Sequence, residues 1–414
     1  MGLEIRPIRS EEVEEFIFAN LYAFNEDRRP EAIQNAVVRA QAVPLEWSLA
    51  AFVDGRLAAG LRALPLTIRI NGAELSMAGI SGVACLPEYR RRGYVGALLK
   101  RALVDMRERE QLLSGLYTPH IALYRRYGWE TAARNVRYSF NPKDVKTLAP
   151  PPSDGRFRRV GIDEWSALNS LYEEYAESRN CLLVRSEEWW RRRVFGENQV
   201  GRVEHPVPDA AVWENGEGRA RGYLIYSTRV GQPPDRAWPE SRMWVRELVT
   251  QDPQAYVALV NYLLAHDIHD RIEMVVPPDE PLLSLFDDPH KVRIEAWSSL
   301  MLRVVDVKAA LEARGCAPEV AGCRFTLAVR DKVLPGNDAT WRVEAMNGRL
   351  SVESGNGAAD LSLDANALGA VLNGHLSVFE AARAGLIGVS NASALQAAAS
   401  VFGVSRPPFC LDYF

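Results

Sequence analysis

The chain of 414 residues is predicted to be an α/β and α+β protein, with two mixed-sheet domains followed by an α+β domain. The first part combines strong hairpin signals with a strand that leads into an amphipathic helix. The second part repeats this pattern more weakly, and the third changes to short alternating strands followed by helices. A proline-rich segment at residues 149–153 marks one boundary. We therefore expect domains at residues 1–150, 151–300 and 301–414.

The first domain carries two turn signals, Asp54-Gly55 and Asn71-Gly72. Both dipeptides favour the left-handed backbone conformations of a two-residue hairpin turn. The expected elements, in order, are an opening segment at Ile5–Ser10, an acidic helix at Glu11–Phe24, strands at Trp47–Val53, Leu57–Leu64, Thr67–Ile70 and Ile80–Leu86, and a helix from Val95 to Met106.

The segment that joins the last of these strands to its helix is the most informative part of the chain. It is an arginine- and glycine-rich loop with the sequence Arg90-Arg91-Arg92-Gly93-Tyr94-Val95-Gly96. The first turn of a helix has unpaired N–H groups and a positive dipole end, and glycine lets a phosphate approach the backbone. Arginines add charge and bidentate donors. The loop therefore predicts an anion site, although an arginine-rich helix start is also compatible with a solvated cap.

The spacing of this loop fits neither a Walker loop nor a dinucleotide fingerprint. It resembles the GNAT superfamily of acyl-CoA-dependent N-acyltransferases, whose motif is Arg/Gln-x-x-Gly-x-Gly/Ala after a strand. Arg90 and Gly93 match this motif, whereas Val95 departs from it and Gly96 comes one residue late. The resemblance implies that the loop binds the pyrophosphate of acetyl-CoA. It also implies that the backbone of Val83, Ala84 and Cys85 pairs with the pantetheine arm.

A second motif, Leu123-Tyr124-Arg125-Arg126-Tyr127-Gly128-Trp129, follows some thirty positions later. In the GNAT superfamily a tyrosine before such an aromatic-Gly-aromatic turn faces the thioester sulfur, which implies that Tyr124 protonates the departing thiolate. A phenol with a pKa near 10 is protonated at neutral pH and suits this role; a core aromatic residue is the alternative. Pro119 and His120, expected on a strand toward Tyr124, should flank the thioester. His120 is a second acid or base candidate, or lines the pocket.

The second domain looks like a degraded copy of the first. The hairpin recurs at residues 211–216 and 222–226, the cofactor strand at Val245–Val249 and the helix at Pro253–Leu264. Gln254-Ala255-Tyr256 stands in place of the phosphate loop, so this half should bind no pyrophosphate and should serve as a scaffold and as a wall of the acceptor pocket. A helical stretch is expected from Trp165 to Arg193, with Trp189-Trp190 either packing or lining a groove.

The third domain resembles the sterol-carrier-protein-like α+β fold. Two acyltransferase-like halves followed by such a domain are the architecture of the Eis-like (enhanced intracellular survival) family, and the segment Asp306 to Gly315 supports this resemblance. The expected elements are strands at Arg324–Arg330, Thr340–Ala345 and Arg349–Glu353, turns at Pro335-Gly336-Asn337 and Asn347-Gly348, and helices at Asp364–Leu372 and Ala392–Phe402.

The chain ends in an apolar, aromatic segment, residues 407–414, whereas a frayed tail is normally polar. The Eis-like resemblance implies that the carboxylate of Phe414 lies in the active site and deprotonates the amine. Partial burial would raise the pKa of that carboxyl and make it a better base. An ordered but inert terminus is the alternative. Asp412 and the loop Asn25-Glu26-Asp27 are further candidates for attracting a cationic substrate.

Net charge and residue composition limit the kinds of partner and cofactor that the sequence predicts. A net charge of −4 gives no overall attraction to nucleic acid or to an anionic membrane. No run of eighteen apolar residues occurs, and the charged N-terminus lacks a signal peptide's apolar region, so we expect a cytoplasmic protein. Cys316 and Cys323 lack a second pair, and His266 with His269 lacks a third ligand. We therefore expect no metal site and no disulfide framework.

The resulting hypothesis is an acetyl-CoA-dependent N-acetyltransferase that transfers directly to a primary amine. The acceptor is an aminoglycoside-like molecule, a polyamine or a protein lysine, and the resemblance implies a homo-oligomer, a hexamer. One alternative is a longer-chain acyl- or aminoacyl-transferase with a duplicated fold, such as N-myristoyltransferases and peptidoglycan aminoacyl-ligases. Another is a non-catalytic carrier of lipid or small molecules through the third domain.

Overall fold

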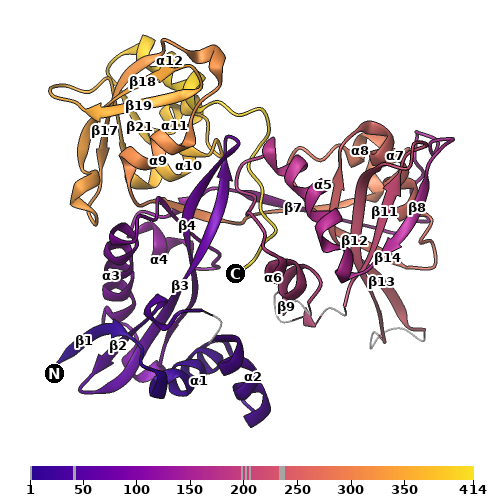
Figure 1. The fold of residues 1–414 in the computed structure, drawn as a ribbon, viewed down its shortest axis with the longest axis horizontal. Helices are drawn as coiled ribbons and strands as arrows, with labels where there is room; N and C mark the ends of the chain where they lie inside the picture. The colour runs from indigo at the N-terminus through magenta and orange to yellow at the C-terminus, as the bar shows by residue number, and fades with distance from the viewer. Residues whose placement is uncertain (1, 41–42, 197–198, 201–202, 205–206, 233–237) are drawn as a thin grey trace. The chain divides into compact units, whose positions relative to one another are not determined.

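The computed structural model describes residues 2–40, 43–196, 199–200, 203–204, 207–232 and 238–414. These residues form two compact units (Figure 1). The first unit contains Met1–Ala132, Leu300–Val404 and Phe414, and the second contains Ala133–Ser299 and Ser405–Tyr413. Each unit is built around its own sheet, and the first also contains the α+β domain.

The first unit has a seven-stranded mixed sheet in the order β1-β2-β3-β4-β5-β16-β6. The pairing of β4 with β5 is parallel, whereas the other pairings are antiparallel. The strands are β1 (Leu3–Pro7), β2 (Ser48–Val53), β3 (Arg56–Ile70), β4 (Ala73–Cys85), β5 (Leu113–Leu116), β6 (Glu130–Thr131) and β16 (Met301–Val304).

Both predicted hairpin turns are present. Asp54 and Gly55 have φ values of 50° and 78°, and Asn71 and Gly72 have φ values of 54° and 80°, which suits a two-residue turn between twisted strands. The predicted break between two strands near Pro65 is wrong, because β3 runs unbroken through it. The pairing of β3 with β2 ends at Arg62, so Pro65 lies where its missing N–H removes no bond to that neighbour.

Helices cover both faces of this sheet, because alternate strand residues point to opposite sides. Leu49 and Ala51 of β2 pack into the cluster that contains α3, whereas Ala50 and Phe52 pack into the cluster that contains α1 and α2. The amphipathic helix predicted after the arginine loop is α3, and the predicted acidic helix is α1 preceded by a short 3-10 turn. The helices are α1 (Val13–Phe24), α2 (Pro30–Ala40), α3 (Tyr94–Glu108) and α4 (Ile121–Arg125).

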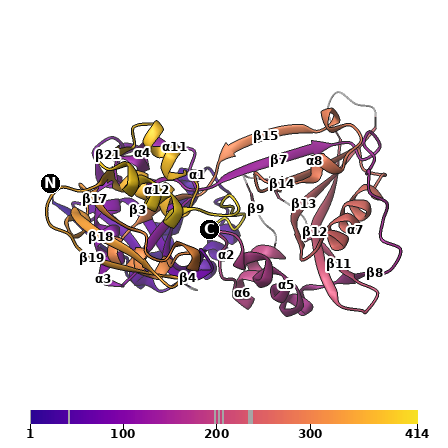
Figure 2. The same cartoon turned by 90° about the horizontal axis from the view of Figure 1, so that it is seen from above.

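The second unit has a seven-stranded sheet in the order β15-β7-β14-β13-β12-β11-β8, in which the β13–β14 pairing is parallel. The edge strand β15 runs beside β7 (Figure 2). Since β7 precedes the proline-rich segment at residues 149–153, that segment does not separate the two sheets. The strands are β7 (Arg134–Phe140), β8 (Arg156–Val160), β11 (Asp209–Glu214), β12 (Ala220–Gly231), β13 (Glu240–Thr250), β14 (Arg271–Val276) and β15 (Arg293–Ser298), besides the separate hairpin β9 (Gln199–Val200) and β10 (Val203–Glu204).

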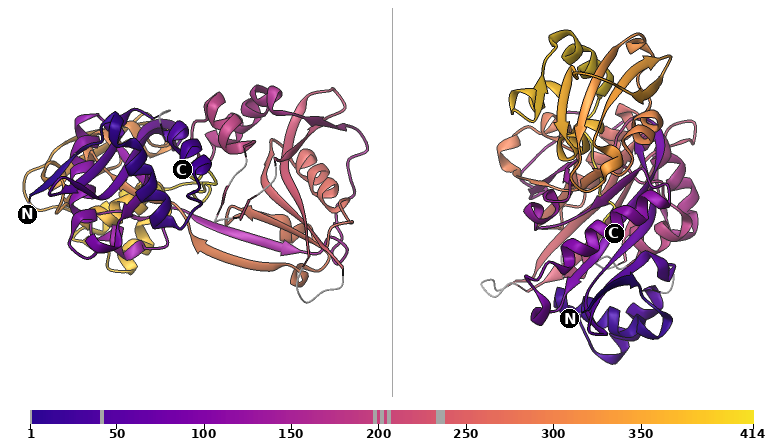
Figure 3. Two further views of the ribbon diagram at one scale, coloured as in Figure 1. Left: turned by 90° about the horizontal axis from the view of Figure 1, so that it is seen from below. Right: turned by 90° about the vertical axis from the view of Figure 1, so that its left-hand side faces the viewer.

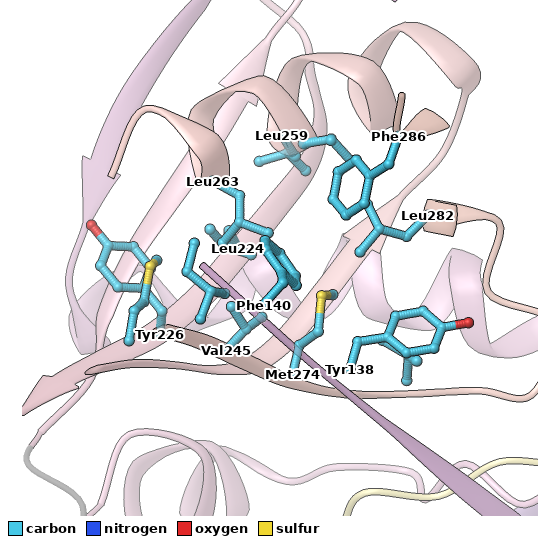
Figure 4. Close-up of a cluster of buried hydrophobic side chains, with 14 of the residues drawn as sticks. Tyr138, Phe140, Leu224, Tyr226, Val245, Leu259, Leu263, Met274, Leu282 and Phe286 are labelled. Carbon is cyan, nitrogen blue, oxygen red and sulfur yellow. The ribbon is translucent and has the colours of Figure 1, made fainter. Parts of the chain in front are cut away.

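Two apolar clusters cover the faces of the second sheet. Leu224 and Tyr226 of β12 pack with α7 (Figure 4), whereas Tyr223 and Ile225 pack with α5 and Trp190 on the other face. The single helix predicted from Trp165 to Arg193 is wrong, because the chain leaves α5 and re-enters a helix at α6, which continues as a π-helical turn. The helices are α5 (Trp165–Glu177), α6 (Glu187–Trp189), α7 (Pro253–Leu264) and α8 (Leu282–Leu285).

The α+β domain completes the first unit with a five-stranded sheet in the order β19-β18-β17-β20-β21. Its last two helices lie beside these strands (Figure 3). Within the described ranges, no helix has the length and apolar character needed to cross a membrane. The elements are α9 (Val307–Arg314), β17 (Arg324–Arg330), β18 (Ala339–Met346), β19 (Arg349–Ser354), β20 (Leu361–Asp364), α10 (Ala365–Leu372), α11 (Val378–Arg383), β21 (Ile387–Val389) and α12 (Ala392–Phe402).

The C-terminal segment 405–413 is anchored in the second unit by a buried ion pair. Arg185 donates from Nε to both carboxylate oxygens of Asp412 at 3.1 Å and binds Glu247 through its two terminal nitrogens. Burial disfavours the charge of Arg185, but the two carboxylates outweigh this and raise its pKa. Trp189 Nε1 donates to Asp412 at 2.8 Å. Asp412 is therefore a structural residue.

We expect Asp412→Ala to lower the free energy of unfolding by roughly 2 kcal/mol, because it leaves a buried guanidinium with one carboxylate instead of two. Thermal or denaturant unfolding measures this change. Asp412→Asn retains the shape and an acceptor and should cost less than Asp412→Ala. Equal stability of all three proteins would contradict the anchoring role.

Candidate active site

The candidate site begins where β4 and β5 part. Their pairing ends at Ile80 and Leu116, whereas β4 continues its pairing with β3 as far as Cys85. Beyond Ile80, in the described part of the chain, one edge of β4 has no strand against it. A ligand with amide groups can add to such an edge as another strand would.

A β-bulge lies at the start of this open edge. Gly82 and Val83 together stand opposite the single residue Leu61, and Gly82 has a φ of 61°. The Gly82 carbonyl accepts a hydrogen bond from Asn20 Nδ2 of α1 at 2.8 Å. Bulges break the regular ladder and re-aim the residues that follow, here the predicted pantetheine-binding residues Val83, Ala84 and Cys85.

Ala84 pairs with Gly60 of β3, and the Cys85 carbonyl accepts from Arg90 Nε at 3.1 Å. Arg90 thereby ties the arginine loop to the end of β4. Burial raises the pKa of the Cys85 thiol, so this thiol is neutral at pH 7 and a poor nucleophile. The chemistry of this site therefore favours a reaction without an acyl-cysteine intermediate.

The arginine loop leads into α3 through two residues with positive φ. Arg91 and Gly93 both adopt left-handed conformations, with φ values of 63° and 85°, and Gly93 directly precedes α3. A left-handed residue directly before a helix, as Gly93 is, can turn successive N–H groups toward one point, which is an anion-binding arrangement. Gly93 offers no side chain to cap α3, and an added Cβ there would meet nothing within 4 Å. The first-turn donors of α3 are thus open to a ligand, with Arg91 and Arg92 exposed beside them.

The corresponding helix of the second unit begins differently. Asp252 caps α7 by accepting from Ala255 N at 2.8 Å, and its other oxygen accepts from Arg221 Nε. A carboxylate at this helix start occupies the donors and repels phosphate. This arrangement is the physical reason to expect no pyrophosphate at Gln254-Ala255-Tyr256.

The residues that follow Gly93 combine helix formation with packing. Tyr94 and Val95 are half-buried against the core cluster of the first unit. Gly96 is buried, and an added Cβ would lie 2.0 Å from the Tyr127 hydroxyl. The missing side chain of Gly96 therefore serves the packing of Tyr127 rather than the approach of a phosphate.

Tyr124 lies on the short helix α4, and the strand expected to carry Pro119 and His120 is wrong. These two residues are exposed in the loop after β5, where the His120 N–H donates to Thr118 Oγ1 at 2.9 Å. Sequence reasoning did not single out Thr118, although its hydroxyl lies close to the motif.

The phenol of Tyr124 is well placed to hold a proton. Tyr124 is only 7% exposed, and its ring meets Trp129 edge to face with centroids 6.2 Å apart. Burial raises its pKa to about 12, against a smaller opposite effect of a hydrogen bond with Thr118. Tyr124 belongs to the core cluster against which Val83, Cys85, Tyr94 and Val95 also pack. Residues from the end of β4, the start of α3 and the helix α4 therefore share one core.

The aromatic side chain of Phe414 lies with the first unit. A Cβ added to Gly79 would approach the Phe414 ring to 2.8 Å, and Tyr117 packs against that ring with centroids 5.2 Å apart. Gly79 pairs with Gly115 of β5, one residue before the two strands part. The chain therefore ends beside the opening between β4 and β5.

The other sequence candidates have structural partners. Asp412 was expected to attract a cationic substrate, but it is buried against Arg185, as described above. Asn25 ends α1 in a left-handed conformation, and Asp27 accepts from Arg29. No group of three or more His, Cys, Asp or Glu side chains suited to a metal occurs among the residues that the structure describes.

Comparison with family models divides the chain into three matches. The description "Acetyltransferase (GNAT) domain" matches residues 4–132 and again residues 181–304. The description "Sterol carrier protein domain" matches residues 307–411.

Proteins of similar sequence or structure are also named as N-acetyltransferases or Eis proteins. An uncharacterized N-acetyltransferase of Streptomyces griseus is 28% identical, over the whole of both chains. The N-acetyltransferase Eis of Mycobacterium tuberculosis is 25% identical over 72% of this chain and 71% of its own. Among solved structures, Eis1 of Mycobacterium abscessus superposes with a TM-score of 0.80 at 26% identity, covering 100% of both chains. A GCN5-related N-acetyltransferase of Anabaena variabilis, with a TM-score of 0.87 at 21% identity over 100% of both chains, shows the fold.

We expect the double variant Arg91→Ala/Gly93→Asp to weaken acetyl-CoA binding by about 3 kcal/mol or more. It removes a charge-assisted donor and sets a carboxylate before the first-turn N–H groups of α3. Isothermal titration calorimetry with acetyl-CoA measures the change. Gly218→Asp/Arg219→Ala is a matched control, since Gly218 also has a positive φ and an open surround. If the first variant bound as tightly as the control, the phosphate site would lie elsewhere.

Proposed function

We propose that this chain, which belongs to the Eis-like family of GNAT N-acetyltransferases, transfers an acetyl group from acetyl-CoA directly to a primary amine. The observation that carries this proposal is the uncapped, left-handed start of α3 beside the open edge of β4, with the buried phenol of Tyr124 in the same cluster. The first two features suit a pyrophosphate and a pantetheine arm, and the third suits a thiolate leaving group.

Backbone N–H groups from Arg91 to Gly96, together with the three arginine side chains, would hold the pyrophosphate. The β4 edge at Val83, Ala84 and Cys85 would pair with the amides of the pantetheine arm and carry the thioester toward Tyr124. Pro119 and His120 would flank that end of the donor. This strand-like pairing aligns the reacting carbonyl, which is a large part of catalysis by positioning.

The chemistry then needs one acid and one base. The neutral amine attacks the thioester carbonyl, and the tetrahedral intermediate expels the CoA thiolate, which takes the proton of the Tyr124 phenol. The attacking nitrogen gives up its remaining extra proton to solvent as the amide forms, and the phenolate takes a proton from solvent before the next turnover. An amine is protonated at neutral pH, so a base must first remove its proton. We assign this role to the terminal carboxylate of Phe414, supported by the position of its ring beside the β4–β5 opening.

The proposed acceptor is an aminoglycoside-like molecule, a polyamine or a protein lysine, since each of these carries a primary amine. Longer acyl or aminoacyl donors, and lipid carriage by the third domain, are less favoured, because the relatives are named N-acetyltransferases. The homohexamer and the cytoplasmic location stay predictions.

Tyr124→Phe keeps the ring and removes the proton donor. We expect kcat to fall by roughly 10²–10⁴-fold while acetyl-CoA affinity stays nearly constant, since only the acid is lost. Steady-state release of CoA and calorimetry with acetyl-CoA measure the two quantities. A kcat equal to that of the parent would remove Tyr124 from the mechanism.

One glycine added after Phe414 moves the terminal carboxylate by roughly 3.5 Å. We expect activity to collapse while the unfolding temperature is unchanged, because a base must lie within hydrogen-bond reach of its proton or one water away. Phe414→Leu is the control, since it keeps the chain length and the carboxylate. An extended chain that acetylates at the parent rate would turn attention to His120.

A further inference from the structure

The segment that carries Tyr124 is a tight turn whose amides converge on the Tyr124 carbonyl. Tyr127 N donates to this oxygen at 2.9 Å, and Trp129 N donates to it at 3.4 Å. Gly128, between them, has a φ of 94°. The orientation of Tyr124 therefore depends on the conformation of residues 124–129, which we call the tyrosine turn.

A side chain of the third domain binds this turn directly. Asn366 Nδ2, in the first turn of α10, donates to the Arg125 carbonyl at 2.8 Å and to the Trp129 carbonyl at 3.0 Å. Both acceptors belong to the tyrosine turn, so one amide group ties its two halves together. The helix comes close enough because Gly369, one turn later, lies against the Leu302 carbonyl, 2.7 Å from the site of an added Cβ.

A buried ion pair holds the same turn from another side. Arg303 of β16 is 0% exposed and donates from Nε to the Tyr127 carbonyl at 3.1 Å. Its Nη2 forms an ion pair with Asp331 of the third domain. A Cβ on Gly128 would lie 2.5 Å from Arg303 Nε, so glycine in the aromatic-Gly-aromatic motif makes room for this guanidinium.

The loop that supplies Asp331 also reaches α3. Asn337 is fully buried, donates to Asp331 Oδ2 at 3.0 Å and accepts from Arg107 Nη1 of α3 at 3.2 Å. Asp331 in addition accepts from Val333 N and Leu334 N at 3.0 Å. Loop 331–337 is thus held by its own hydrogen bonds and contacts both Arg303 and α3, the helix that follows the arginine loop.

From these contacts we infer that the third domain is a positioning element for acyl transfer: Asn366 and the Arg303–Asp331 pair hold the tyrosine turn, and thereby aim the Tyr124 phenol at the leaving group. This inference rests on the proposed function, which assigns the acid role to Tyr124. Asn366, Arg303 and Asp331 are positioning residues, since they act through the turn and touch no reacting atom.

The physical reason is geometric. Proton transfer to a thiolate requires the phenol within hydrogen-bond reach at the moment of bond cleavage, and displacements near 1 Å are costly to rate. A five-residue helix such as α4 is too short to hold its own shape. Its last carbonyls need partners: amides of the turn bond to the Tyr124 and Arg125 carbonyls, and Asn366 of the third domain adds a second donor to the Arg125 carbonyl.

The test is a double-mutant cycle between Asn366 and Tyr124. Asn366→Leu is nearly equal in size and removes both hydrogen bonds. CoA release from acetyl-CoA is measured with an aminoglycoside, a polyamine and a lysine peptide as acceptors, together with acetyl-CoA affinity and thermal unfolding. We expect kcat to fall roughly 10–100-fold with acetyl-CoA affinity unchanged. In a Tyr124→Phe background, the same substitution should change kcat less than twofold.

Asn391→Ala is the matched control. Asn391 caps α12 of the same domain and bonds to Asp360, so its loss weakens the domain without touching the tyrosine turn, and kcat should stay at the parent value. A fall in kcat of Asn366→Leu that is equal in both backgrounds, or no fall at all, would overturn the inference. A parent that acetylates none of the acceptors, or an unimpaired Tyr124→Phe, would instead overturn the proposed function.

Discussion

The packing of the tyrosine turn against the third domain depends on one buried positive charge, the guanidinium of Arg303, which is 0% exposed. Arg303 can remain charged there only because each of its donor groups has an acceptor, namely Asp331 and the carbonyls of Tyr127 and Val304. Burial lowers the pKa of this guanidinium, and the carboxylate opposes that effect. Losing one partner of such a pair costs several kcal/mol. Arg303 therefore links the tyrosine turn to Asp331 of the third domain through one buried polar centre.

The two GNAT domains show how few residues decide whether a helix start can take an anion. Each domain has a parallel strand pair and a helix after the central strand. At α3 the position before the helix is Gly93, in a left-handed conformation and without a side chain, whereas at α7 it is Asp252, which bonds to its own helix. The same backbone dipole is thus open in one domain and internally satisfied in the other.

Local signals predicted the parts of the fold that depend on neighbouring residues. The turns at Asp54-Gly55 and Asn71-Gly72, the stripe of α3 and the helix starting at Pro253 all depend on chemistry within a few positions. The choice of which strand pairs with which does not depend on residues within a few positions. Nothing near β7 or β16 in the sequence says that each pairs in the sheet of the other GNAT domain, because a strand of either sheet has the same alternation.

The same distinction holds for the site. The arginine loop and the tyrosine motif were identifiable as local patterns, and resemblance supplied their chemistry. The supports could not be found in this way, because Asn366 lies 241 positions from Arg125 and Arg303 lies 176 positions from Tyr127. Asn20, which braces the bulge at Gly82 from α1, gave no signal either. Gly128 was visible in the sequence as part of the motif, and the structure gives two reasons for a glycine there: a φ of 94° and the Arg303 guanidinium close by.

The candidate site combines an exposed part, the arginine loop, with a buried part, the phenol of Tyr124. The proposed pyrophosphate site must let CoA enter and leave, and Arg91, Arg92 and Gly93 are exposed on a loop. The proposed proton donor must keep one position, and Tyr124 is buried, which raises its pKa to about 12. A short helix cannot meet the second demand from its own hydrogen bonds. The tyrosine turn is therefore supported from a neighbouring domain. Asn366 and Asp331 of the sterol-carrier-like domain supply this support, Asn366 directly and Asp331 through Arg303.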